Sequence, residues 1–228
     1  MEVIKITDRE LIGSGGNWKV YEGNLLNETD DPVIIKTNDK ISEYKINGNI
    51  KNYELIKSLG LPTLKFFRKA KIDKELAIVA ENLNNISDVI YVTPNSVITI
   101  QNKKMDQITG KKRIESKAEQ KLYDNKISTI NNLLEFIQDI KIKLAEISRL
   151  KVILEYDCYF LGISNQNILD YKIADFDTIF ECDDKSTEEC YQINLDELKR
   201  VLMLFIEYFI IETEQSELSK IVNENLLS

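Results

Sequence analysis

The segment from Val152 to Phe180 constrains this chain more than any other part of its sequence. It reads VILEYDCYFLGISNQNILDYKIADFDTIF and carries two acids, Asp157 and Asp175, eighteen positions apart. Asp175 follows an apolar run that is typical of a buried strand. Acids at the ends of strands and loops are suited to the handling of a metal-bound phosphate. The segment therefore predicts a phosphate-handling site, for which the upstream residues would supply the nucleotide half.

The composition limits the chemistry of such a site. The 228 residues include no histidine, so acid–base chemistry would fall to carboxylates, lysine, tyrosine or cysteine. The net charge of −8 argues against a protein that binds nucleic acid mainly through its phosphates. Three cysteines, Cys158, Cys182 and Cys190, are odd in number and form no C-x-x-C pair. We expect reduced thiols in a cytosol, without a disulfide framework or a zinc site.

The apolar segments of the chain are short. The N-terminal sequence MEVIKITDRE has no apolar region of the kind found in a secretory signal. The longest apolar run, VLMLFIEYFII, is interrupted by Glu207 and falls short of the ~20 residues needed to cross a bilayer. It predicts a buried helix, and we expect no membrane span.

A glycine-rich segment near the N-terminus is the first candidate for phosphate binding. Leu11 to Gly23 reads as a strand, a turn and a strand, with Gly13, Gly15 and Gly16 at the turn. Glycines let the backbone approach a phosphate, and the N–H groups of such a turn can cradle it. An ordinary hairpin also explains the pattern.

Lys36 is the second candidate. It ends the β-branched run Val33 to Lys36, and a lysine at the end of a buried strand needs a partner. Phosphate, a carboxylate or water could be that partner. A helix is expected within residues 42–59, more firmly after the break at Asn47-Gly48-Asn49, and Glu54 in it could pair with Lys36.

The rest of the pattern predicts an α+β fold whose two halves are lobes of one unit. Strands are expected at 64–72 and 75–80, and a hinge follows them. A hairpin is expected at 89–101, a charged segment at 102–125, and apolar helices at 128–149, 193–211 and 216–227. Asn194 is expected to cap the 193–211 helix, because Glu197 three residues later would complete a capping box.

Taken in order, these features resemble the protein kinase fold. The matching segments are Gly13–Tyr21 (GSGGNWKVY) for the glycine-rich loop, Val33–Lys36 for the lysine strand, Glu81–Leu83 for the hinge, Val152–Asp157 (VILEYD) for the catalytic segment and Lys172–Asp177 (KIADFD) for the metal-binding segment. The resemblance implies a bilobal, kinase-like α+β domain. It implies a β-rich N-lobe at 1–83, a hinge and insertion at 84–126, and a truncated helical C-lobe at 127–228.

The resemblance also implies roles for particular residues. ATP would be held by the glycine-rich loop, by Lys36 and by the hinge, through Gly13, Ser14, Gly15, Gly16, Val20, Glu81 and Leu83. Glu54 would hold Lys36, with Glu43 as a weaker option. Asp175 would bind Mg²⁺, and Asp157 would be the catalytic base.

Several positions depart from the family pattern. Trp18 replaces the third glycine of the loop, and Tyr159 stands two residues after the base, where a lysine is usual. The metal-binding asparagine expected five residues after the base is Gly162. Either Asn167 or Asn165 reaches the metal through a rearranged loop, or the second metal site is missing.

The segment after Asp177 is short and has no A-P-E motif. Asp196, in the helix that follows, resembles the buried acid that braces the family's catalytic loop. The outline is similar to that of atypical minimal kinases, such as the RIO type and small bacterial effector kinases. A cytoplasmic location, reached in a host cell if the protein is an effector, would follow.

The resemblance therefore implies an ATP-dependent phosphotransferase, first of all an atypical serine/threonine protein kinase without an activation segment and with a protein substrate. One alternative is a catalytically impaired pseudokinase that acts as a binding module. A second is a small-molecule kinase of the aminoglycoside or choline kinase type. The basic segment 103–122 is a solvated stretch or a docking site for an acidic partner or polyphosphate.

Overall fold

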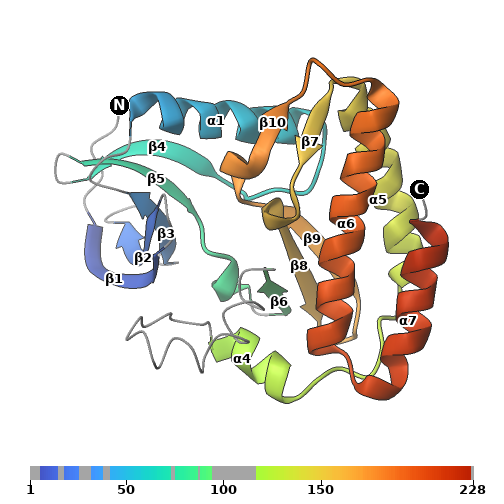
Figure 1. Ribbon diagram of the computed structural model, residues 1–228. Coiled ribbons are helices and arrows are strands. Elements are labelled where there is room, and N and C mark those ends of the chain that lie inside the picture. The colour runs from blue at the N-terminus through green and yellow to red at the C-terminus, as the bar shows by residue number, and fades with distance from the viewer. Residues whose placement is uncertain are drawn as a thin grey trace, which may run out of the picture.

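The computed structural model describes residues 6–14, 18–25, 32–37, 42–72, 75–86, 88–93 and 117–226, and they form a mixed α+β fold (Figure 1). Gly15 and Gly16 of the expected phosphate loop lie outside the described residues. So do most of the expected 89–101 hairpin beyond Thr93 and most of the basic segment 103–122.

The N-terminal part is a five-stranded antiparallel sheet with the strand order β1-β2-β3-β5-β4. Its strands are β1 (Ile6–Ser14), β2 (Lys19–Leu25), β3 (Val33–Thr37), β4 (Phe67–Ile72) and β5 (Glu75–Glu81). Alternation along β3 buries Val33 and Ile35 in a small apolar cluster on one face. Ile34 and Lys36 therefore lie on the opposite face of the sheet.

Helix α1 (Glu43–Ser58) packs against β4 and β5, on one side of this sheet (Figure 1). The predicted break at Asn47-Gly48-Asn49 is wrong, because the helix is continuous there. Ser42 caps its start by accepting a hydrogen bond from the Lys45 N–H. Asn49 is buried and donates its amide to the Lys45 carbonyl within the helix. Gly60 (φ +67°) follows the helix and ends it, as expected.

Two smaller sheets lie beside the first. One has the order β6-β8-β9, with β6 (Val89–Val92), β8 (Tyr159–Ser164) and β9 (Leu169–Ile173). The other pairs β7 (Val152–Leu154) with β10 (Ile179–Glu181). Single-turn 3₁₀ helices lie between these strands: η1 (Leu83–Asn85), η2 (Tyr156–Cys158) and η3 (Phe176–Thr178). Residues 152–181 are therefore a run of short strands joined by tight turns.

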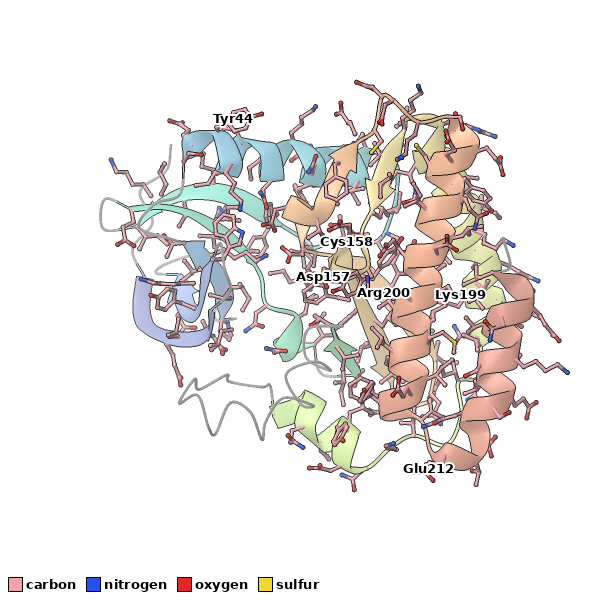
Figure 2. All side chains as sticks on the ribbon, viewed as in Figure 1. Tyr44, Asp157, Cys158, Lys199, Arg200 and Glu212 are labelled. Atoms are coloured by element: carbon pink, nitrogen blue, oxygen red, sulfur yellow. The ribbon has the colours of Figure 1, made fainter. Side chains whose placement is uncertain are left out.

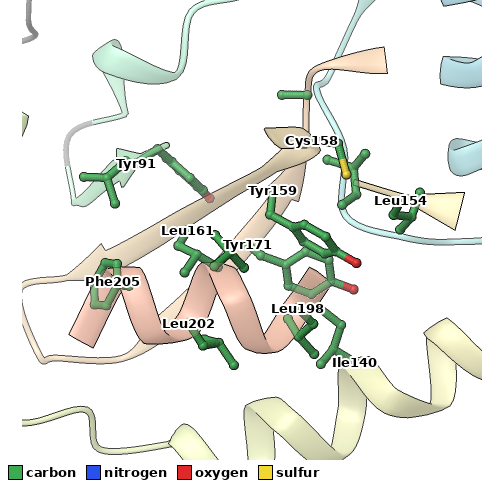
Figure 3. Packing of buried hydrophobic residues seen from close by; sticks show 14 of the residues in the cluster. Tyr91, Ile140, Leu154, Cys158, Tyr159, Leu161, Tyr171, Leu198, Leu202 and Phe205 are labelled. Atoms are coloured by element: carbon green, nitrogen blue, oxygen red, sulfur yellow. The ribbon is translucent and has the colours of Figure 1, made fainter. Parts of the chain in front are cut away.

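Four helices complete the described fold: α4 (Lys117–Asp124), α5 (Leu133–Arg149), α6 (Thr187–Phe209) and α7 (Glu212–Asn225). Helices α5, α6 and α7 pack on one another, and Figure 1 shows them beside the two smaller sheets. Figure 3 shows the core between them, where Tyr159 and Tyr171 from β8 and β9 face Leu198 of α6 and Ile140 of α5. The main apolar core runs from Trp18 to Leu226 and joins both parts of the chain.

Helix α6 begins six residues earlier than the sequence predicts. Ser186 is its N-cap, and a reciprocal capping box joins it to Glu189. Asn194, predicted to be the cap, lies inside the helix and is fully buried. Among the described residues, no helix is both long and apolar enough to cross a membrane.

Candidate functional site

Lys36 and Asp175 form the centre of the site. The Lys36 Nζ lies 2.7 Å from Asp175 Oδ1, and both side chains are largely buried, at 14% and 26% exposed. Lys36 reaches this position because β3 points it away from the outer apolar cluster. Asp175 reaches it because β9 ends two residues earlier, and the chain turns there into η3. A buried amine and carboxylate compensate each other's loss of hydration.

Phe176 anchors the turn that carries Asp175. Its ring is fully buried and packs edge-on against Phe67 of β4 and Tyr53 of α1, with ring centroids 4.6 Å and 5.4 Å away. The Asn52 side chain of α1 donates hydrogen bonds to the carbonyls of Phe176 (2.8 Å) and Ile179 (2.9 Å). Helix α1 therefore fixes both the backbone and the side chain of this turn, and with them the position of Asp175.

A second carboxylate, Asp177, lies beside the first. Its Oδ2 accepts a hydrogen bond from Trp18 Nε1 (3.1 Å) and lies 3.6 Å from Lys45 Nζ. With both acids ionised, Asp177 Oδ1 is buried and receives no hydrogen bond within the described residues. Trp18, the residue at the third glycine position, is itself buried. The chain thus places an indole, two amines and two carboxylates together.

The two acids influence each other's protonation. Burial raises the pKa of Asp175, Lys36 lowers it, and the hydrogen bond to Asp177 together with its negative charge raises it again, so the net direction is upward. Burial also acts to raise the pKa of Asp177. That effect is outweighed by the hydrogen bond from Asp175, the Lys36 charge, the Trp18 hydrogen bond and the Lys45 charge, which lower the pKa. A proton entering this pair therefore goes first to Asp175.

Asp157 lies in η2, which packs against η3 and so against the turn of Asp175. Helix α6 supports this turn from behind. The backbone N–H of Tyr156 donates to Glu197 Oε2 (2.9 Å), and the Arg200 guanidinium lies 3.7 Å from the centroid of the Tyr156 ring. In the view of Figure 2, exposed Arg200 of α6 and half-buried Asp157 are labelled next to each other. The position of Asp157 is therefore set by residues of α6.

Glu155, just before this turn, has an unusual environment for an acid. Burial raises its pKa, and the negative charges of Glu197 and Asp157 raise it further, while Arg200 acts in the opposite direction. The positive charge of Arg200 therefore offsets part of the repulsion that Glu155 receives from Glu197 and Asp157.

The sequence predicted that Asp196 braces the turn of Asp157, and this prediction is wrong. The acid that contacts the turn is Glu197. Asp196 is exposed and accepts a hydrogen bond from Gln192, one turn earlier on α6. Asn194 contributes to the same brace, because its side chain accepts from Leu154 N–H (2.8 Å) and donates to the Val152 carbonyl (2.9 Å). The prediction was wrong by one residue, because Asp196 and Glu197 are adjacent and only Glu197 faces the turn.

The predicted pairing of Lys36 with Glu54 is wrong. Glu54 is exposed on α1, and Lys36 pairs with Asp175. The alternative, Glu43, is also exposed and pairs with Lys69 of β4. Two polar side chains of α1, Lys45 and Asn52, contact Asp177 or the turn that carries the acids, and neither is acidic.

The predicted metal ligand Asn167 lies far from Asp175. Asn167 (φ 58°) and Asn165 lie in the turn that joins β8 to β9, at the opposite end of that hairpin from Asp175. The full length of β9, about 16 Å for five residues, separates them. Neither asparagine therefore belongs to the site.

Gly162 cannot be replaced by an asparagine without rearrangement. It lies in β8 opposite Tyr91, and a Cβ there would come within 2.7 Å of the Tyr91 ring and of Val89. The loop that the resemblance implied after Asp157 is not formed in the described residues 157–175, because β8 begins two residues after Asp157. The eighteen-residue spacing is kept by a longer hairpin in place of that loop.

The other predicted nucleotide-binding residues border the same region. Gly13 and Ser14 end β1, where they pair with Val20 and Lys19 of β2. Glu81 and Leu83 are buried where the chain leaves the five-stranded sheet. The Glu81 carboxylate accepts hydrogen bonds from the Lys65 N–H (2.7 Å) and from Lys172 Nζ of β9 (2.9 Å). An ion pair therefore joins the end of β5 to β9.

The sequence prediction missed three residues whose partners are far away in the chain: Trp18, Lys45 and Asn52. Asn49 and Asn52 follow Lys45 at helical spacings of four and seven, so they share a face of α1 with Ile46 and Tyr53. That spacing is a usable signal, but Asn47-Gly48-Asn49 in the same segment is also typical of a helix break. Trp18 departs from the glycine-loop pattern, and nothing in the sequence points to its contact with Asp177.

The site has oxygen ligands that fit a hard cation. Asp175 and Asp177 offer carboxylate oxygens, one of them buried without a donor, and Mg²⁺ is commonly held by one or two carboxylates together with phosphates. No group of three or more metal-binding acids or thiols occurs among the described residues. An ion here would therefore share its coordination with a bound ligand.

Neither a scan against protein-family models nor a search of curated proteins finds a match to this chain.

Proposed function

We propose that this chain is an ATP-dependent phosphotransferase with a bilobal, kinase-like fold, first of all an atypical serine/threonine protein kinase without an activation segment. The Lys36–Asp175 ion pair at 2.7 Å carries the proposal. It joins the two residues to which the resemblance assigns phosphate and metal binding. They are 139 positions apart in the chain, so sequence proximity does not explain their contact.

The order of elements supports the same proposal. A glycine-containing hairpin, a strand ending near Lys36, the helix α1, a strand pair and a long helix follow one another. After them come the turns of Asp157 and Asp175. The two turns pack against each other, the turn of Asp175 against α1 and the turn of Asp157 against α6.

In the proposed mechanism the residues act mainly by positioning and by neutralising charge. ATP supplies the phosphoryl group, and Mg²⁺ neutralises its phosphates. Lys36 would bind the α- and β-phosphates, and Asp175 with Asp177 would hold the cation. Asp157 orients the acceptor hydroxyl or accepts its proton. The absence of histidine is no obstacle, because no step requires one.

Transfer from radiolabelled ATP tests this function, with the purified chain alone and with a eukaryotic lysate. We expect label on a protein in the presence of Mg²⁺ and none with Lys36→Ala or Asp175→Ala. Asp157→Ala should bind ATP and transfer nothing. Lys51→Met is the matched control, because Lys51 forms an exposed ion pair with Glu181 away from the acids. Normal turnover in Asp175→Ala would contradict the mechanism.

A pseudokinase that acts as a binding module is the second candidate, and three observations favour it. Trp18 is bonded to Asp177, no acid of α1 reaches Lys36, and β8 replaces the loop with the second metal ligand. A thermal-shift measurement with ATP and Mg²⁺ separates the candidates in part. Stabilisation without transfer of label supports the binding module, and so does the absence of any shift.

The acceptor defines the third candidate, a small-molecule kinase. Only residues 182–186 connect β10 to α6, which leaves little chain for a peptide to lie along. Label on a small molecule of the lysate, with none on protein, would favour this reading over a protein kinase.

A further inference from the structure

Helix α1 brings a cation to the site where the family resemblance implied an acid. The Lys45 side chain is one-third exposed. Its Nζ lies 3.6 Å from Asp177 Oδ2 and 5.8 Å from the centroid of the Trp18 ring. The proposed mechanism assigns Lys45 no role. It is nevertheless the second amine, after Lys36, that contacts the pair of acids.

The charges of this cluster balance. Lys36 compensates Asp175, and Lys45 lies nearest Asp177, so two amines face two neighbouring carboxylates. Both acids are the proposed cation ligands. When they hold Mg²⁺, each amine loses its carboxylate partner and needs another anion nearby. The phosphates of a nucleotide are such anions.

The contact of Lys45 is looser than that of Lys36. Its 3.6 Å separation is an ion pair without a hydrogen bond, whereas Lys36 is at hydrogen-bonding distance from its acid. Trp18 holds Asp177 from the other side through its indole N–H. The Lys45 amine therefore lies where three elements meet: the start of β2, α1 and the η3 turn. Because it is held weakly, Lys45 can move to a new anion with little loss of interaction energy.

We propose that Lys45 is a second phosphate-binding cation, held near Asp177 and Trp18 until a nucleotide enters. This inference rests on the proposed nucleotide site and adds a residue to it. Lys45 moves from the carboxylate to a phosphate, and Asp177 becomes available to the metal. Helix α1 would therefore contribute a lysine that contacts phosphate directly, in place of the acid that the resemblance implied as the partner of Lys36.

Calorimetric titration with ATP and with adenosine, each in Mg²⁺ and in EDTA, tests the proposal on the full chain. We expect Lys45→Met to weaken ATP binding about ten- to hundredfold, which is the usual effect of losing one hydrogen bond to a charged group. Adenosine binding should be unchanged, because adenosine has no phosphate. Lys45→Arg should restore ATP binding, and Lys51→Met of the same helix should leave it unchanged.

Two further measurements guard against a purely structural effect. Asp177→Asn removes the competing charge, so ATP should bind more tightly than to the wild type in EDTA. Trp18 is the only tryptophan of the chain, so its fluorescence reports directly on this contact. ATP should change the emission of the wild type, and adenosine should not.

The outcomes separate this inference from the proposed function. A wild type that binds neither ATP nor adenosine overturns the nucleotide site and the inference with it. A wild type that binds ATP while Lys45→Met binds it equally well overturns the role of Lys45 alone. Equal losses for ATP and adenosine in Lys45→Met, or an Asp177→Asn variant with unchanged ATP affinity in EDTA, also overturn it.

Discussion

Lys36 and Asp175 illustrate how strongly a single contact can depend on both partners. Each side chain is largely buried, so removing one leaves the other with an uncompensated charge. Lys36→Met or Asp175→Asn should each lower the free energy of unfolding by about 1–3 kcal/mol. The double variant should lose less than the sum of the two. Urea denaturation of the four proteins measures this coupling, and strictly additive losses would contradict it.

Two glycines respond oppositely to alanine because their surroundings differ. A Cβ at Gly162 would meet Tyr91 and Val89 at 2.7 Å, whereas a Cβ at Gly48 would meet nothing within 4 Å. Gly162→Ala should therefore destabilise the protein by about 1–3 kcal/mol. Gly48→Ala, inside α1, should stabilise it by about 0.5–1 kcal/mol.

Thermal unfolding of both glycine variants provides the measurement. Gly162→Asn, which introduces the residue that the resemblance to kinases implied at this position, should be at least as destabilised as Gly162→Ala and should gain no metal-dependent stabilisation. A Gly162→Asn protein stabilised by Mg²⁺ would show that β8 can rearrange into a ligand-bearing loop.

At the scale of elements, one residue caps the start of helix α6 and another connects the helix to β7. Ser186 caps it at the surface, and Ser186→Ala should cost about 1 kcal/mol. Asn194 is fully buried and bonds the backbone of β7 on both sides. Asn194→Ala should cost about 3 kcal/mol, because it leaves a buried N–H and a buried carbonyl unpaired. Equal losses in denaturation experiments would contradict this division of roles.

The elements that local pattern defines were predictable. The β-branched runs gave β3 and β5, apolar periodicity gave α5 and α7, and Gly60 gave the end of α1. The start of α6 was placed too late because two capping boxes lie close together, and only tertiary packing selects the one at Ser186. Which of Asp196 and Glu197 faces inward depends on the rotation of α6 against η2, and no local pattern encodes that rotation.

The candidate site was predictable in its acids and its lysine but not in their pairing. Asp157, Lys36 and Asp175 were each suggested by short motifs. Lys36 has a choice between acids on α1 and on η3, and packing of Phe176 against α1 decides it. Such choices depend on contacts between distant segments, which a single sequence does not display.

At the scale of the whole molecule, buried tyrosines make the stability of the fold depend on pH. Burial raises the pKa of Tyr91 and Tyr171, and the nearby charge of Asp170 raises both further. In the unfolded chain such phenols ionise near pH ~10. Above that pH the folded protein holds protons that the unfolded chain loses, so stability falls as pH rises. Below it this contribution is fully present.

Urea denaturation between pH 9 and pH 11, with absorbance of the phenolate as a second probe, measures this effect. We expect the free energy of unfolding to decrease across that range, and the slope to be smaller in Tyr171→Phe. A stability that stays constant to pH 11 would show that these phenols ionise freely in the folded protein.

The brief connection at residues 182–186 has a consequence for engineering. Asp183, Asp184 and Ser186 are exposed, and the connection is fastened to its neighbours mainly through Lys151. Exposed turns with small or polar residues are the sites where inserted sequence is best tolerated. A recognition loop grafted between Asp184 and Ser186 would start just after β10, which follows the turn that carries the two acids. The fold could therefore serve as a scaffold to which a loop for acceptor recognition is added without redesign of its core.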